Sequence, residues 1–302
     1  MKWFILIVCS LQPIGCTSTQ QPPQHINSVS VELERCVTIE DGHQNSMSID
    51  SFWERVNQAD VVILGELHDH VVGHAFQEIV VRYVMESFPK STLALEMLER
   101  DEQSIIDDFL DDIVDGEKLA TLTHSQNWAG KGSWVAWYQP ILNTTKELGG
   151  SIIGANAPRR YVTLARTEGF DAIKALPPYR RSLVSIPEPL VDNHYQDRFF
   201  ELAGITEHDE RCEESDRVFG FYRAQQVWDA TMADSVAQLN PTVDAKVLLL
   251  VGQFHVEYDG GLIQLLKRDL PNANVLVITV HRSSPDLEFE DIPISDVIVY
   301  EN

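Results

Sequence analysis

Short unbroken runs of apolar residues alternate along this chain with longer segments in which apolar residues recur every three to four positions. Such a run is typical of a β-strand buried on both faces, as in a parallel sheet. Two of the runs, 61–64 and 247–251, lead directly into Gly-x-x-His, at 65–68 and 252–255. The predicted strands are 61–64, 92–95, 151–154, 247–251 and 275–279.

Segments with helical spacing lie between these runs. In 71–88, Phe76, Val80 and Val84 recur on one helix face, and Pro89 ends the segment because its ring cannot continue a helix. The alternation of strands and crossover helices predicts an α/β fold, with a mostly parallel sheet flanked by helices. The predicted helices are 51–58, 71–88, 101–112, 134–148, 190–202, 215–239 and 262–270.

The strand pattern disappears between residues 159 and 239, where prolines at 177, 178, 187 and 189 interrupt the chain. We therefore predict a smaller all-helical subdomain at 159–239, beside an α/β core domain formed by 51–158 and 240–302. The alternative is that these helices are ordinary outer helices of the core.

The first residues resemble a bacterial secretion signal. Lys2 precedes a short apolar stretch, and Gly15 precedes Cys16. This arrangement predicts a signal peptide at 1–15 and a lipid anchor at Cys16, although Pro13 departs from the usual pattern before the cleavage site. Thr17 favours the outer membrane of the cell envelope. Residues 16–50 then form a lipidated tether and N-terminal segment, because their first half is rich in Gln, Pro, Ser and Thr.

The formal net charge of −23 argues against a nucleic-acid partner and against adhesion to anionic lipid through the protein surface. Contact with a membrane is therefore expected through the N-terminal lipid only. After removal of the signal, Cys36 and Cys212 remain in a compartment that permits disulfides. A Cys36–Cys212 bridge is our hypothesis, and two unpaired thiols are the alternative.

Polar residues follow four of the predicted strands. The carboxyl ends of parallel strands share one edge of a sheet, and open α/β sheets bind their ligands there. We therefore expect one candidate site at this edge. The alternative is that each histidine caps a helix or hydrogen-bonds to backbone. The site consists of Glu66, His68, Glu96, Asn156 and His255.

Histidines beside carboxylates suit three tasks, namely binding a divalent metal, acid–base catalysis and holding a haem. Spacing does not choose among them. The sequence contains no H-E-x-x-H, G-x-S-x-G or G-x-G-x-x-G motif, so the zincin, α/β-hydrolase and dinucleotide-binding classes lose support.

The residues between about 51 and 279 resemble the ChaN-like haem-binding uptake proteins of the Tiki/erythromycin-esterase superfamily. The resemblance implies a parallel α/β domain with a small helical domain, a lipid anchor, and haem held between the domains. It further implies a role in haem and iron uptake beside transporter components, in some cases as a homodimer around haem. The matching segments are 65–69, 95–97, Trp134 with 137–140, 155–159, 224–225 with 228–229 and 232–233, and 252–256.

A ferric haem needs an axial ligand, an apolar surface and cations for its propionates. Tyr161, one turn into the helix after Arg159 and Arg160, is a candidate phenolate ligand beside two guanidiniums. The alternatives are an amphipathic surface tyrosine and surface ion pairs of the arginines. Tyr138 is the second candidate ligand.

The same superfamily contains hydrolases, in which the Gly-x-x-His turn and glutamates resemble a metal or general-base site. Glu66, His68, Glu96 and His255 match that pattern as well. A metal-dependent hydrolase is therefore the alternative function, with a divalent metal as its cofactor. A lipoprotein with a vestigial pocket is a third possibility.

Overall fold

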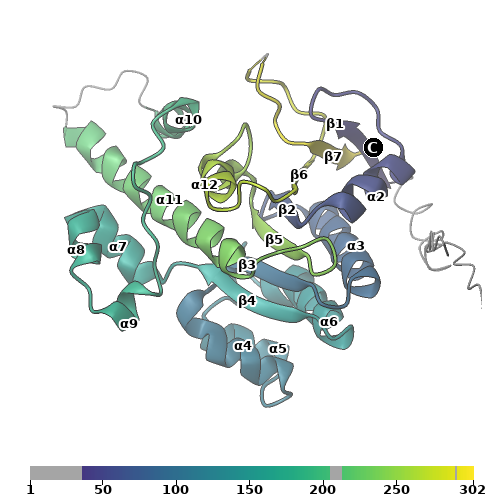
Figure 1. Cartoon of the computed structure of the whole chain (residues 1–302), viewed down its shortest axis with the longest axis horizontal. Helices are drawn as coiled ribbons and strands as arrows, with labels where there is room; N and C mark the ends of the chain where they lie inside the picture. Colours follow the sequence, from purple (N-terminus) through teal and green to yellow (C-terminus); the bar gives the residue numbers. More distant parts are fainter. Residues whose placement is uncertain (1–35, 205–212, 290) are drawn as a thin grey trace, which may run out of the picture.

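A computed structural model describes residues 36–204, 213–289 and 291–302 of this protein. Within these ranges seven strands form a single sheet in the order β1-β7-β6-β2-β5-β3-β4 (Figure 1). All neighbouring strands are parallel except β1 and β7, which are antiparallel. The strands are β1 (Val37–Asp41), β2 (Val61–Glu66), β3 (Thr92–Glu99), β4 (Ser151–Asn156), β5 (Val247–Gly252), β6 (Val275–His281) and β7 (Val297–Glu301).

Helices cover both faces of this sheet, which confirms the predicted α/β class (Figure 1). The α-helices are α2 (Ile49–Gln58), α3 (Val71–Ser87), α4 (Gln103–Leu110), α5 (Gly116–Leu122), α6 (Gln139–Glu147), α7 (Arg159–Glu168), α8 (Phe170–Lys174), α9 (Pro178–Arg181), α10 (His194–Leu202), α11 (Glu213–Gln238) and α12 (Gly261–Asp269). The short helical turns are η1 (Arg100–Glu102), η2 (Trp134–Tyr138) and η3 (Gln253–His255).

Successive residues of the central strands pack into two different hydrophobic cores, because side chains alternate between the two faces of a strand. Val62 and Leu64 of β2 pack with α2, α3, α4 and α6 on one face. Val61 and Ile63 pack with α11 and α12 on the other face. Both faces of β2 and β5 are buried, so their apolar runs carry no exposed position, as the sequence indicated.

Several boundaries differ from the predicted ones. Strands β1 and β7 and helix α5 were not predicted, because each is short and mixes apolar with charged residues. Strand β3 continues beyond Glu96 to Glu99, with an irregularity between Leu95 and Glu99 where it pairs with β4. The predicted helix 134–148 begins with the π-helical turn η2, and the predicted helix 101–112 begins as the 3-10 turn η1 and ends at Leu110.

Residues 159–204 and 213–238 form helices α7 to α11 and contain no strand in the part that the structure describes. Helix α11 packs against α7 and α12, and its second half shares a core with the sheet. Whether 159–239 is a separate subdomain therefore stays a prediction. Helix 190–202 begins at His194 instead, where the Asn193 side chain caps it.

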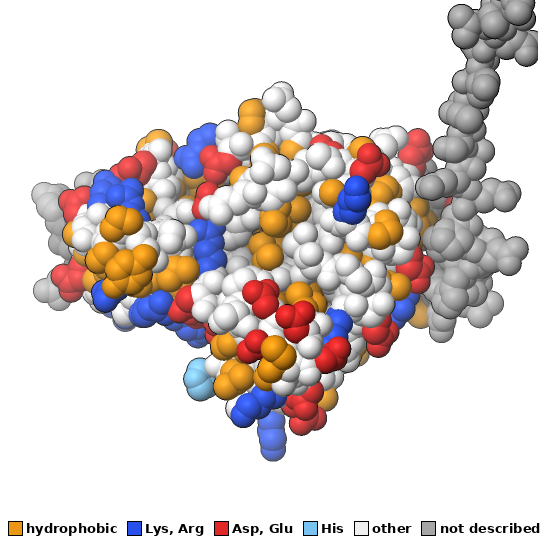
Figure 2. All heavy atoms as spheres, turned by 60° about the horizontal axis from the view of Figure 1, so that its bottom comes forward, with side chains coloured by type: hydrophobic (Ala, Val, Ile, Leu, Met, Phe, Trp, Pro, Cys, Tyr) orange, Lys and Arg blue, Asp and Glu red, His pale blue; other side chains and the backbone are white. Residues whose placement is uncertain are grey.

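The predicted signal peptide and Cys16 lie outside the described residues, as does Cys212. Cys36 is exposed and has no disulfide partner within the described ranges. No described helix is both long enough and apolar enough to cross a bilayer. Acidic, basic and apolar side chains are interspersed on the face of the molecule that Figure 2 shows.

Candidate functional site

The predicted site residues come together at the carboxyl edge of the central strands. Glu66 is the last residue of β2, and His68 follows two residues later. Glu96 lies in β3, and Asn156 is the last residue of β4. His255 ends η3, the turn that follows β5. The parallel order β2-β5-β3-β4 places these strand ends side by side.

Glu66 is the centre of a buried hydrogen-bond network. Its side chain is almost completely buried. Tyr138 donates its hydroxyl to Oε1 at 2.6 Å, and Gln77 donates an amide N–H to Oε2 at 2.7 Å. The Nδ1 atom of His68 lies 2.9 Å from Oε1. Since a buried carboxylate needs such partners, Glu66 fixes the orientation of the His68 ring.

The charges in this network shift the pKa values of both partners. Burial raises the pKa of Glu66, but the hydrogen bond from His68 and the nearby His74 outweigh it, so the pKa lies below its usual value. Burial lowers the pKa of His68, but the hydrogen bond to Glu66 and the charge of Glu96 raise it above its usual value. The folded protein therefore holds the proton of His68 more tightly than a free imidazole would.

The substitution Glu66→Gln is expected to lower the pKa of His68, because it removes the largest interaction that favours the charged imidazole while burial remains. A pH titration of the imidazole resonances by NMR measures this shift. Glu78→Gln, which removes a carboxylate from a half-buried ion pair with Arg82, is the control and is expected to leave His68 unchanged. An unaltered His68 titration in Glu66→Gln would contradict the assigned orientation.

His255 is held by a second buried carboxylate. Asp229 of α11 approaches Nδ1 of His255 with Oδ1 at 2.5 Å, and Tyr195 of α10 donates its hydroxyl to Oδ2 at 2.8 Å. Gln225 donates to Tyr195 and also lies 3.1 Å from Nδ1 of His255. Burial lowers the pKa of His255, but the charge and hydrogen bond of Asp229 raise it above its usual value.

Asp229, Tyr195 and Gln225 were not predicted as site residues. They lie on helices that approach the strand edge from the region without strands, so the strand-end pattern could not identify them. Asp229 and Gln225 did occur in the segments that carry the family resemblance, and that was their only signal in the sequence.

Glu96 lies between the two imidazoles. Its Oε1 is 3.8 Å from Nε2 of His255, and its Oε2 accepts the backbone N–H of Gly252 at 2.6 Å. A Cβ atom at Gly252 would lie 3.1 Å from the His68 ring and 3.5 Å from Glu96, so this position leaves space for both side chains. Asn156 donates its amide to the backbone oxygen of Glu96 at 2.9 Å. The structure thus brings all five strand-end residues together.

Arg159 and Arg160 begin helix α7 next to this group. The Arg159 guanidinium lies 5.0 Å from the centre of the Trp128 indole, and that ring lies 6.2 Å from the His68 ring. The Arg160 guanidinium lies 4.6 Å from the centre of the Tyr161 ring. Tyr161 itself is only 6% exposed and packs between α7 and α11, so the alternative of a surface tyrosine is wrong.

Two carboxylate-held imidazoles on either side of a third carboxylate can take up and release protons near neutral pH. Within the described ranges, no group of three or more His, Cys, Asp or Glu side chains is arranged to hold a metal ion. The half-exposed His68 ring, the Trp128 indole and the arginines offer contacts for a flat, anionic ligand.

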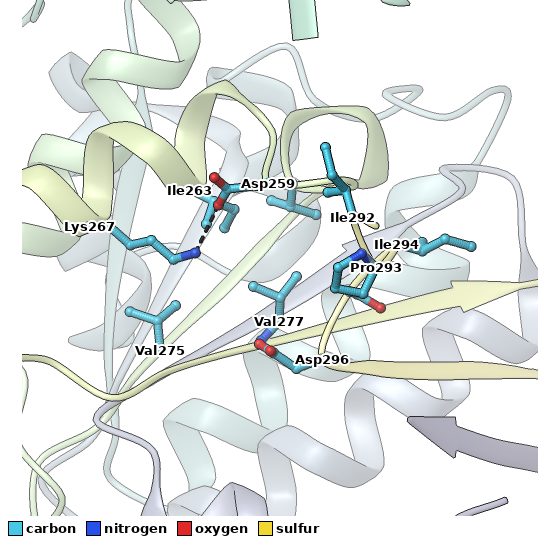
Figure 3. Close-up of a pocket in the computed structure, with 11 residues that line it drawn as sticks. Asp259, Ile263, Lys267, Val275, Val277, Ile292, Pro293, Ile294 and Asp296 are labelled. Atoms are coloured by element: carbon cyan, nitrogen blue, oxygen red, sulfur yellow. Dashed lines mark hydrogen bonds and ion pairs between the residues drawn. The ribbon is translucent and has the colours of Figure 1, made fainter. Parts of the chain in front are cut away.

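A separate hollow of about 190 Å³ lies between α12, β6 and residues 292–296 (Figure 3). Ile263 and Val277 form part of its apolar wall, and Lys267 reaches across to Asp259, with Nζ 2.8 Å from Oδ1. None of the predicted site residues lines this hollow.

Comparison with known proteins gives one family match. A family model described as "Haem-binding uptake, Tiki superfamily, ChaN" matches residues 52–266. A solved structure described as "Cofacial heme binding to ChaN of Campylobacter jejuni" superposes with a TM-score of 0.65 at 22% identity. The match covers 89% of this chain and 98% of that one. At this level of identity the likeness establishes the shared fold.

Two further similarities are more distant. A mutant erythromycin esterase in its open conformation superposes with a TM-score of 0.45 at 15% identity, covering 87% of this chain and 83% of that one. The chain is also 24% identical over 265 residues to Protein RETICULATA-RELATED 5, chloroplastic, of Arabidopsis thaliana, covering 82% of this chain and 35% of that protein. The chain therefore spans about a third of the length of this relative.

Proposed function

Because this chain belongs to the ChaN haem-binding uptake family of the Tiki superfamily, we propose that it binds haem at the sheet edge beside the start of α7. The observation that carries this proposal is the grouping of Trp128, Arg159, Arg160, Tyr161 and the half-exposed His68. These residues include a candidate axial ligand, an aromatic surface and two cations, which are the groups that haem requires of its site.

The residues present fit those requirements. The iron of a ferric haem takes a phenolate or an imidazole as its axial ligand. The Arg160 guanidinium lies 4.6 Å from the centre of the Tyr161 ring, so a cation adjoins this candidate ligand. Nδ1 of His68 is held by Glu66, as is common for imidazoles that ligate a metal. The hydroxyl of Tyr138 is already donated to Glu66, so Tyr138 is a poorer ligand than Tyr161.

Titration of the purified protein with haemin tests the proposal. We expect a Soret band of bound ferric haem and a phenolate-to-iron charge-transfer band. Tyr161→Phe is expected to lose that second band and about tenfold in affinity, equivalent to about 1.4 kcal/mol. Tyr179→Phe is the matched control, because the exposed Tyr179 also carries an arginine against its ring, Arg180. Absence of a Soret shift in the unaltered protein would refute haem binding.

We further propose that the protein takes part in haem and iron uptake. In this role it would be anchored through a lipid on Cys16, at the outer membrane of a bacterial cell, and would pass haem to transporter components. Homodimerisation around haem belongs to the same proposal. Mass spectrometry of the mature N-terminus tests the anchor, and an unmodified Cys16 would contradict it.

Hydrolysis is the second candidate function. The two carboxylate-held imidazoles favour it, since a haem carrier has no evident need for a buried His255–Asp229 pair facing Glu96. A panel of chromogenic esters, assayed with and without a chelator, tests this function. Turnover that disappears in both His68→Ala and His255→Ala would support hydrolysis, and chelator sensitivity would indicate a metal.

A further inference from the structure

Each arginine at the start of α7 already holds a carboxylate of this chain. Nε of Arg159 lies 3.5 Å from Oε1 of Glu99, and Nη1 of Arg160 lies 2.6 Å from Oδ2 of Asp101. The two arginine side chains are 70% and 52% exposed, and the two carboxylate side chains are 22% and 27% exposed. Both ion pairs are therefore open to solvent on the arginine side.

Glu99 occupies a position that suits an anion. Besides the guanidinium, the backbone N–H of Arg159 favours the charged form of its carboxylate and opposes the rise in its pKa that burial causes. That N–H belongs to the first residue of α7, where the partial positive charge of the helix dipole is concentrated. Trp128 lies against the same guanidinium, on the side that leads to His68. A bound carboxylate, a cation and an aromatic plane thus adjoin one another.

We propose that Arg159 and Arg160 form a subsite for the free propionates of a porphyrin. On binding, the propionates displace Glu99 and Asp101 from the two guanidiniums. This inference rests on the proposed haem binding and states which chemical groups of the ligand the site selects. The ligand class is a flat aromatic macrocycle that carries free carboxylates. An esterified porphyrin would lack the groups that compete for the arginines.

The displacement has a low free-energy cost, because one carboxylate replaces another on the same guanidinium. Exposed ion pairs contribute little to stability, so their loss costs the fold little. The net gain from the exchange is also small, and the flat ring supplies most of the affinity. The subsite therefore acts mainly as a filter for ligands with free carboxylates.

The exchange is coupled to proton uptake. Burial raises the pKa of Glu99, and it raises the pKa of Glu102, which accepts the Glu99 N–H, to about 7. The charged groups that face this pair are Asp101, Arg159 and Arg160. Arg100 turns away from it to bind Asp234.

When a propionate takes Arg159, Glu99 and Glu102 lose a neighbouring cation, so their carboxylates bind protons more readily. Binding of an iron-free porphyrin should therefore strengthen as the pH falls from 8 to 6, because acid neutralises the competing carboxylates. Haemin does not isolate this effect, since ligation of its iron by Tyr161 releases the hydroxyl proton. Uptake of a full proton would change the affinity about tenfold per pH unit, and partial uptake would change it less.

The test uses protoporphyrin IX, which has both propionates but no iron for Tyr161 to ligate. It measures affinity at pH 6, 7 and 8 by optical titration, and proton uptake at pH 7 by calorimetry in buffers of different ionisation enthalpy. We expect affinity to rise several-fold from pH 8 to pH 6, with net proton uptake. Glu99→Gln should bind more tightly at pH 8 and show a flatter pH profile. The dimethyl ester of protoporphyrin IX should bind more weakly than the free acid, without proton uptake.

Glu78→Gln is the matched control, because it also removes a carboxylate from a half-buried arginine, Arg82, in another part of the molecule. It should behave as the unaltered protein does. If Glu78→Gln matched Glu99→Gln, or if the ester bound as well as the free porphyrin acid, the subsite would be overturned while haem binding remained. If haemin produced no Soret shift at any pH, the proposed function itself would fail.

Discussion

Replacement of Asp229 by Ala is expected to lower the free energy of unfolding by about 3–5 kcal/mol, the usual cost of removing one partner from a buried charge pair. Asp229 is fully buried and holds both His255 and Tyr195. Its loss leaves an imidazole and a phenol without that acceptor in a site that water reaches poorly. Asp229→Asn, which keeps an acceptor oxygen, is expected to cost less.

Urea-induced unfolding followed by circular dichroism measures this effect at pH 6 and pH 8. The pKa of His255 is raised above 6.5 in the fold, so the stability from its charged form is complete below 6.5 and is lost as the pH rises through the folded value. The effect of Asp229→Ala should therefore be larger at pH 6. Glu78→Ala is the control, with an expected cost of about 0–1 kcal/mol. Equal losses of unfolding free energy in the two variants would show that the buried Asp229–His255 pair contributes no more to stability than a surface ion pair does.

The substitution Gly154→Ala is expected to cost about 2–3 kcal/mol, in the upper range for overpacking, because the obstacle is backbone. A Cβ atom at Gly154 would lie 2.4 Å from the backbone oxygen of Glu99 and 2.9 Å from its carbonyl carbon. Only a shift of β3 against β4 would relieve this clash. Since the same segment of β3 carries Glu96 and Glu99, haemin affinity should fall together with stability.

Gly150→Ala separates this effect from a general intolerance of larger residues near β4. Its Cβ atom would meet the sulfur of Met85 at 2.6 Å and a methyl group of Thr145 at 2.9 Å. Met85 is a flexible side chain that can change rotamer, so we expect a cost below about 1.5 kcal/mol. Thermal unfolding and haemin titration of both variants provide the comparison. A Gly150→Ala variant as unstable as Gly154→Ala would refute the backbone explanation.

The central strands and the meeting of their polar ends could be predicted from the sequence because both follow from local patterns. An apolar run fixes a buried strand, and the shared direction of parallel strands then places Glu66, Glu96 and Asn156 at one edge. The Gly-x-x-His turns added His68 and His255. No knowledge of contacts between distant segments was required for this step.

The partners of these residues could not be predicted, since they depend on how helices dock. Asp229 lies on one helix and Tyr195 on another, and their meeting at His255 is set by the packing of α10 and α11. Strands β1 and β7 could not be predicted from the sequence for a similar reason. Each is stabilised by pairing with the other across almost the whole length of the chain, as in Val37 opposite Glu301.

Two aspartates along the 26 residues of helix α11 bind side chains of other elements. Asp229 contacts His255, and five positions later Asp234 binds Arg100, with Oδ2 2.7 Å from Nη2. One inserted or deleted residue between them would rotate the far half of the helix by about 100°. Both contacts could not then be kept. Homologues that share this arrangement should therefore vary in length outside this interval and tolerate no gap within it.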